Sequence, residues 1–263
     1  MSYTNLQSLE EIKNKKVLFY DLETTGLVKT PKGLKPEEEY PDFKDKIYDD
    51  VRIVSIGWFY TKDFNYENQI KIENISERII KPEGFIIPEE SIKIHGITNE
   101  DANTLGKELK KSLKKFGKII KKCDYIIGYN IFYDINVLLS ELHRKKRNKT
   151  IEKILKLKQE KKIFCLGQLS AQEAKPDKWR QHNNYKFPSQ KMVYKKCFNQ
   201  ELENVHNAKY DILATINIMF WIYENKNYTK NLSLKYDLSN LEENANTNVN
   251  TNVKNGKNLN ITI

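Results

Sequence analysis

The sequence KVLFYDLETTGL, residues 16–27, places an apolar run directly before two carboxylates, Asp21 and Glu23. The run predicts a buried strand over residues 16–20 that ends at the acids. Side chains two residues apart on a strand point to the same face, so both carboxylates are expected in one small volume. Like charges that close raise each other's pKa, and a divalent cation, which prefers oxygen ligands, relieves the repulsion. The alternative is an ordinary solvated turn, in which Asp, Thr and Gly are common.

Composition narrows the class of protein. The chain has 263 residues and a net charge of +10, which favours a polyanionic partner such as nucleic acid, although a coding bias toward Lys, Asn and Ile would also raise the charge. Its three cysteines are widely spaced and form no C-x-x-C pair, which argues against a disulfide framework or a zinc site and favours a reducing, intracellular setting. No apolar signal core and no run long enough to span a bilayer is present, so we expect a soluble protein without membrane contact.

Hydrophobic periodicity predicts an α/β protein. Strands come first and then alternate with helices, which indicates a mixed sheet with helices on both faces. The apolar segments expected in the sheet are residues 16–20, 51–60, 68–81, 125–128 and 163–166. The expected helices are residues 99–121, capped by Thr98 or Asn99, and residues 130–142, 188–199 and 207–224. We divide the chain into an N-terminal extension (1–14), one domain (15–225) with an insert loop (28–50), and a polar, Asn-rich, disordered tail (226–263).

Two later segments bring further acids to the same edge of the sheet. Asn130 is a natural N-cap, and Asp134 lies about one turn into the following helix, near the crevice beyond the strand ends. His206 and Asp211 can face one site only if His206 lies on the loop before the last helix, with Asn207 as its cap. Each segment alone has an ordinary explanation, as an exposed helix Asp or a loop His, and their convergence favours a site.

The motifs together resemble the DEDDh 3′-to-5′ exonuclease family over residues 15–225. The matching positions are residues 21–27; Asn130, Asp134 and Leu138; His206, Ala208 and Asp211; and the H-G-I-T segment at residues 95–98. The resemblance implies a ribonuclease H-like fold with a mixed five-stranded sheet. The long insert, the basic stretch 143–162 and the tail depart from the family pattern and leave the substrate open.

The resemblance also implies a mechanism and a set of site residues. Asp21, Glu23, Asp134 and Asp211 would hold two Mg²⁺ or Mn²⁺ ions, and His206 would act on the attacking water. The residues expected to bind the substrate are Thr24, Leu27, His95, Asn130 and Phe132, of which Leu27 and Phe132 could equally belong to the core.

The expected reaction is release of nucleoside 5′-monophosphates from a single-stranded 3′ end, with DNA favoured over RNA. Two alternatives stay open: an exoribonuclease of the same family, and a nucleic-acid-binding or proofreading subunit that acts with a polymerase or another replication or repair partner.

Overall fold

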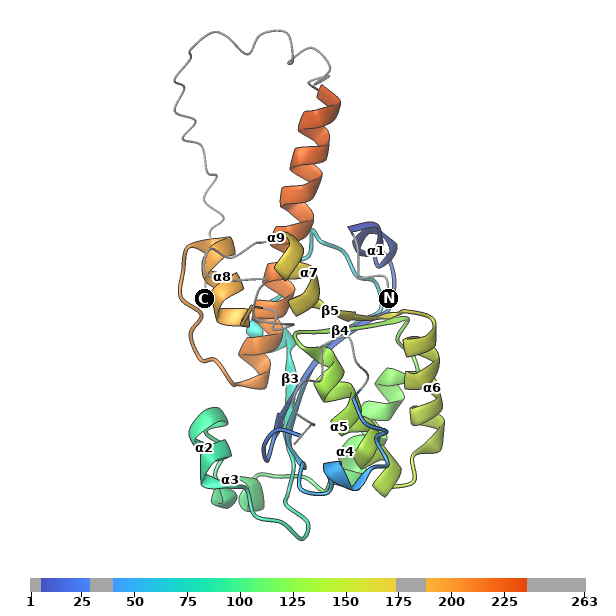
Figure 1. Cartoon of the computed structure of the whole chain (residues 1–263), viewed down its shortest axis with the longest axis vertical. Helices are drawn as coiled ribbons and strands as arrows, with labels where there is room; N and C mark the ends of the chain where they lie inside the picture. Colours follow the sequence, from blue (N-terminus) through green and yellow to red (C-terminus); the bar gives the residue numbers. More distant parts are fainter. Residues whose placement is uncertain (1–5, 29–39, 174–187, 236–263) are drawn as a thin grey trace. The chain divides into compact units, whose positions relative to one another are not determined.

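The computed structural model describes residues 6–28, 40–173 and 188–235. Its centre is a five-stranded sheet of order β3-β2-β1-β4-β5 (Figure 1). The strands are β1 (Val17–Thr24), β2 (Ile53–Thr61), β3 (Ser76–Ile79), β4 (Tyr125–Gly128) and β5 (Ile163–Cys165). β2 is antiparallel to both β1 and β3, whereas β4 runs parallel to both β1 and β5. The prediction of a mixed five-stranded α/β sheet is therefore confirmed.

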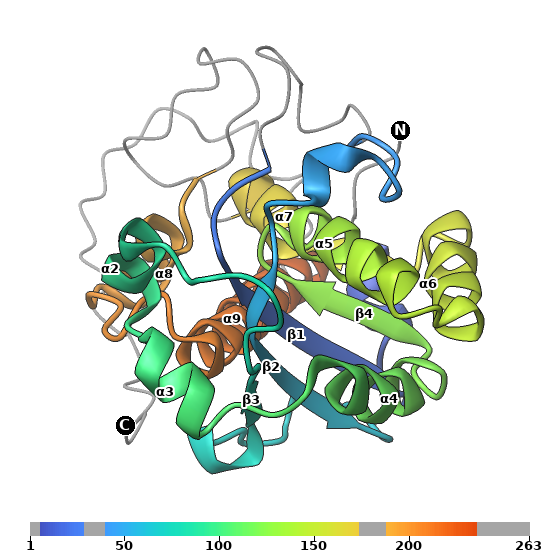
Figure 2. The same cartoon turned by 90° about the horizontal axis from the view of Figure 1, so that it is seen from below.

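Two hydrophobic clusters cover the two faces of the sheet, because β1 sends alternate side chains to opposite sides. Leu18, Tyr20 and Leu22 enter the first cluster, which lies under α4 (Leu109–Ile120), α5 (Ile131–Arg144) and α6 (Asn148–Gln159). Val17 and Phe19 enter the second cluster. The helices that contribute to the second cluster are α1 (Leu6–Glu11), α7 (Leu166–Glu173), α8 (Gln190–Phe198) and α9 (Ala208–Lys235). Figure 2 shows α9 behind β1, on the side of the sheet away from α5.

Two predicted elements differ from the observed ones. The strand expected over residues 68–81 is only β3, which pairs antiparallel with β2 and is preceded by a 3₁₀ turn over Ile72–Asn74. The helix expected over residues 99–121 is two helices, α3 (Asn99–Thr104) and α4. The helix is interrupted around Gly106, where a Cβ would lie 2.7 Å from the backbone nitrogen of Lys81. Leu105, which lies between the two helices, is consequently 57% exposed.

Four helices were not predicted. They are α1 in the N-terminal extension, α2 (Glu89–His95) before the helix expected over residues 99–121, α6 within the basic stretch 143–162, and α7 directly after β5. Thr98 caps α3, because its hydroxyl accepts a hydrogen bond of 3.0 Å from the Asp101 N–H. The insert 28–50 lies partly outside the described residues and contains a 3₁₀ turn over Lys46–Tyr48.

The chain divides into one compact unit over Met1–Glu224 and a second over Asn225–Ile263. Of the second unit the structure describes the continuation of α9 to Lys235, which is helical where the sequence predicts the start of a disordered tail; residues 236–263 lie outside the described residues. Among the helices that the structure describes, none has the length and apolar character needed to cross a bilayer.

Candidate metal centre and active site

β1 presents Asp21 and Glu23 on one face of the sheet, as the spacing predicts. They continue the row of Val17 and Phe19, so they point to the side of the second cluster and of α9. Glu23 is 7% exposed, and Asp21 is partly buried. Two carboxylates thus lie at the carboxyl end of a central strand, with little water to screen them.

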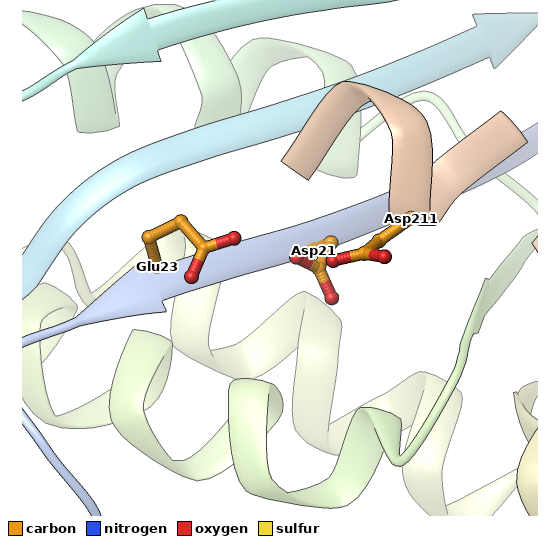
Figure 3. A group of neighbouring side chains, drawn as sticks. All are labelled: Asp21, Glu23 and Asp211. Atoms are coloured by element: carbon orange, nitrogen blue, oxygen red, sulfur yellow. The ribbon is translucent and has the colours of Figure 1, made fainter. Parts of the chain in front are cut away.

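α9 adds the third acid because its first turn comes very close to β2. Gly57 pairs with Asp21 across the sheet, and a Cβ on Gly57 would lie 2.8 Å from the Cβ of Ala208. This close approach brings Asp211 over β1, so that ligand atoms of Asp21, Glu23 and Asp211 all lie within 4.8 Å of one another. Figure 3 shows Asp21 and Asp211 side by side, with Glu23 farther along the strand.

Asp134 lies beside this trio without belonging to it. It is 4% exposed in the first turn of α5, where the backbone N–H of Leu22, between the two acids of β1, donates to its carboxylate. Asn130 occupies the N-cap position of α5 as predicted, but its backbone is left-handed and its side chain makes no capping hydrogen bond. The amide of Asn130 is therefore not used to cap the helix.

Burial raises the pKa of all four acids, and the negative charges of neighbouring acids raise the pKa of Asp21, Glu23 and Asp134 further. Burial, followed by the charges of Asp134 and Asp211, places the pKa of Asp21 well above its usual range. Burial and the same neighbours raise the pKa of Glu23 to about 9. Burial raises the pKa of Asp211 to about 7, opposed by a backbone N–H from His206. Hard oxygen donors with this much mutual repulsion fit a divalent cation such as Mg²⁺ or Mn²⁺.

His206 lies on the loop before α9, as the spacing requires. It is exposed with a φ of 62°, and the Asn207 side chain caps the helix by accepting a hydrogen bond of 3.1 Å from the Lys209 N–H. The backbone of His206 is thus tied to Asp211, while its imidazole is open to solvent.

His95, at the end of α2, is 9% exposed and close enough to His206 that the charge of His206, after burial, lowers its pKa. Its Nδ1 accepts a hydrogen bond of 3.1 Å from the Ile97 N–H, so a proton on the neutral ring resides on Nε2. Nε2 is buried and has no hydrogen-bond partner among the residues that the structure describes. His95 therefore holds an unused donor near His206.

The turn after β1 holds the other residues expected to meet substrate. Leu27 is 79% exposed, which removes the alternative that it is a core residue, whereas Phe132 packs against the first cluster. The Thr24 hydroxyl bonds to the Gly26 carbonyl at 3.0 Å.

Two further residues at the site were missed by sequence reasoning. The Tyr133 hydroxyl lies 2.8 Å from the Thr24 hydroxyl and donates to the Gly26 carbonyl at 2.6 Å. The sequence signal that could have indicated this role is that Tyr133 directly precedes Asp134. The Gln190 amide on α8 donates to the Asp211 carbonyl at 2.7 Å, and nothing in its sequence context indicates this contact.

Comparison with known proteins assigns the chain to a family. The family model RNase_T, described as Exonuclease, matches residues 18–219. A search of curated proteins finds no match to the chain.

Several solved structures have a similar fold. E. coli exonuclease I in a zinc-bound complex with single-stranded DNA matches with a TM-score of 0.57 and 17% identity, over 85% of this chain and 43% of that one. The E. coli enzyme with a dT13 oligonucleotide matches with a TM-score of 0.54 and 16% identity, over 87% of this chain and 46% of that one. Exonuclease I from Methylocaldum szegediense matches with a TM-score of 0.54 and 17% identity, over 84% of this chain and 43% of that one. This chain therefore spans less than half the length of these structures, and the fold that they share with it is ribonuclease H-like.

Proposed function

Because the chain belongs to the RNase_T exonuclease family, within the DEDDh superfamily, we propose that it is a metal-dependent 3′-to-5′ exonuclease that removes nucleoside 5′-monophosphates from single-stranded DNA. The observation that carries the proposal is the convergence of Asp21, Glu23 and Asp211 to within 4.8 Å at the carboxyl end of β1. The preference for DNA is supported by the single-stranded DNA and the dT13 oligonucleotide bound to the similar exonuclease I structures.

The acids would hold the metal. Asp21, Glu23 and Asp211 would hold two Mg²⁺ or Mn²⁺ ions, and Asp134 would assist directly or through water. Two such ions, when bound, stabilise the attacking and leaving oxygens of an in-line phosphodiester displacement. The raised pKa values of Asp21, Glu23 and Asp211 mean that these carboxylates gain most from a bound cation.

His206 is proposed as the general base. It would take a proton from the attacking water, whose oxygen then bonds to phosphorus while the bond from phosphorus to the 3′-oxygen of the preceding nucleotide breaks. That 3′-oxygen takes up a proton and becomes the new end of the strand, and the released nucleotide carries a 5′-phosphate. The exposed loop position of His206 allows its imidazole to return the proton to solvent.

The terminal nucleotide would be held by the surrounding side chains. The exposed Leu27 side chain and the backbone at Thr24 offer an apolar and a polar contact, and Phe132 is the weaker candidate because it packs against the core. The Nε2–H of His95, which has no partner among the described residues, and the amide of Asn130, which does not cap α5, suit oxygen atoms of the substrate. The expected polymerase or repair partner stays a prediction.

Matched DNA and RNA single strands, labelled at either the 3′ or the 5′ end, test the proposal. We expect the 3′ label to leave at once as a mononucleotide, the 5′-labelled strand to shorten stepwise, and DNA to be degraded faster than RNA. EDTA should stop the reaction and Mn²⁺ should restore it. First release of the 5′ label would overturn the direction, faster loss of RNA would overturn the substrate, and hydrolysis in EDTA would overturn the metal requirement.

A further inference from the structure

The net positive charge of this protein lies in one part of the chain. Residues 107–162 contain 18 Lys and Arg against 6 Asp and Glu, a net charge of +12, whereas the whole chain has +10. The remaining residues therefore carry a net charge of −2. A coding bias toward lysine would act along the entire chain, so it does not explain this segregation.

The densest part of the segment is the exposed surface of α4 and the turn that follows it, which we name the lysine ridge. Its members are Lys110, Lys111, Lys114, Lys115, Lys118, Lys121 and Lys122. No acidic residue lies within α4, and of these lysines only Lys111 forms an ion pair, with Glu108, in the part of the chain that the structure describes. α6 crosses beside α4, since a Cβ on Gly117 would lie 2.8 Å from the Thr150 hydroxyl, and adds exposed Lys149 and Lys156.

Such a surface has a cost in the isolated protein. Lysines three or four residues apart on a helix repel each other, and each such pair destabilises the helix. Lys110, Lys114, Lys118 and Lys122 form an unbroken series at this spacing. A bound polyanion would turn the same repulsion into attraction.

The segment that leads into the lysine ridge meets the sheet near the ends of the strands where the acids lie. Glu23 pairs with Ser55 on β2, and Ser55 pairs with Ile79 on β3. The next residue, Ile80, bridges to Lys107. Three steps at the usual strand spacing separate Lys107 from Glu23 by about 14 Å.

From these strand ends the lysine ridge extends across the sheet. Lys110 and Lys122 are separated by about 18 Å at the rise of an α-helix. Beyond Lys122 the chain enters β4, whose Tyr125 pairs with Val17 at the opposite end of β1 from the acids. The two distances together give a path of at least about 32 Å from the acid cluster to the end of the lysine ridge, the length of about ten nucleotides at 3.4 Å each.

We propose that the lysine ridge binds the phosphate backbone of the nucleic-acid strand whose 3′ end lies at the acid cluster. The inference rests on the proposed function, and it adds a second contact region on the α4 face of the sheet, separate from the catalytic acids. The contact is electrostatic and independent of sequence, so it raises affinity for long strands and leaves the chemical step unchanged.

The test compares two triple variants with equal loss of charge. Lys114→Gln, Lys118→Gln and Lys122→Gln neutralise the lysine ridge, whereas Lys15→Gln, Lys62→Gln and Lys71→Gln neutralise exposed lysines outside the basic segment. Binding of a fluorescent single-stranded DNA 30-mer is measured in EDTA over a range of salt concentrations, which requires no catalysis. The KM values for the 30-mer and for a trinucleotide are then measured with Mn²⁺.

We expect the ridge variant to bind the 30-mer about tenfold more weakly at low salt, and the slope of log affinity against log salt to fall by about 2. The trinucleotide is too short to reach the ridge, so its KM should be equal in all three proteins. Equal losses in both triple variants, a ridge variant with unchanged 30-mer affinity, or equally tight binding of polyglutamate would overturn the inference. A wild type that binds the 30-mer with the expected salt slope and hydrolyses neither substrate would instead refute the proposed function alone.

Discussion

Ala208 lies against Gly57 so closely that a Cβ on the glycine would be 2.8 Å from the alanine Cβ and 3.1 Å from its carbonyl carbon. Gly57 is the residue of β2 that pairs with Asp21, and Ala208 begins the helix that carries Asp211. The separation between the two acids is therefore set by the absence of a side chain on the strand next to them.

Gly57→Ala should displace the start of α9 and with it Asp211. A shift of about 1 Å in a catalytic group can lower activity about a hundredfold, so we expect a loss of that size together with weaker Mn²⁺ binding by calorimetry. Gly117→Ala is the matched control, because its Cβ would also lie 2.8 Å from a neighbour, the Thr150 hydroxyl, but far along the chain from the acids. Equal losses of Mn²⁺ affinity in both variants would contradict the role given to Gly57.

Asp211→Asn should abolish the reaction while the fold survives. Loss of one ligand removes several kcal/mol of transition-state stabilisation, so kcat should fall about a thousandfold or more. The fold should persist because the substitution removes a repelling charge from the cluster. The measurements are nuclease activity and thermal unfolding in EDTA, with Glu152→Gln on the exposed surface of α6 as the control. Substantial activity in pure Asp211→Asn protein would refute the metal assignment.

The metal-free protein should lose stability as the pH rises. The pKa values of Asp211 and Glu23 are raised to about 7 and about 9, against about 4 in an unfolded chain. The folded protein therefore holds more protons than the unfolded chain between these values, so the free energy of unfolding falls as the pH increases through them. We expect a lower Tm in EDTA at pH 9 than at pH 5, and a weaker dependence in Glu23→Gln. A Tm in EDTA that rises over this range would contradict the repulsion described above.

The elements that hold the acids could be predicted because their signals are local. The apolar run before Asp21 and the alternation along β1 determine both the strand and the shared face of Asp21 and Glu23. The position of His206 also followed from local geometry, since five residues on one helix could not place it beside Asp211. These predictions depend only on the period of a strand or a helix.

Other features depend on contacts between distant segments. The break at Gly106 arises where the chain passes Lys81, and the pairing of Lys107 with Ile80 replaces helical hydrogen bonds there. Periodicity alone cannot reveal such a contact, so it favoured one long helix. The contact of Gln190 with Asp211 is missed for the same reason, because it joins residues on two helices whose packing is not encoded in either one.

Tyr133→Phe should weaken substrate binding without affecting the metal. The Tyr133 hydroxyl holds the turn after β1 through Gly26 and Thr24, and this turn presents the exposed Leu27. A buried hydrogen bond contributes about 1 kcal/mol, so its loss should loosen the turn and raise the KM for DNA up to about tenfold, with kcat and Mn²⁺ affinity nearly unchanged.

Tyr66→Phe is the matched control for that change. It also deletes a buried tyrosine hydroxyl, which donates to the Leu9 carbonyl at 2.8 Å on the side of the second cluster. Both variants should lose a similar amount of thermal stability, because each loses one hydrogen bond of the same kind. Only Tyr133→Phe should raise the KM, since only this hydroxyl contacts the turn that carries Leu27. Equal KM values in the two variants would show that the Tyr133 hydroxyl serves stability and does not position the substrate-binding turn.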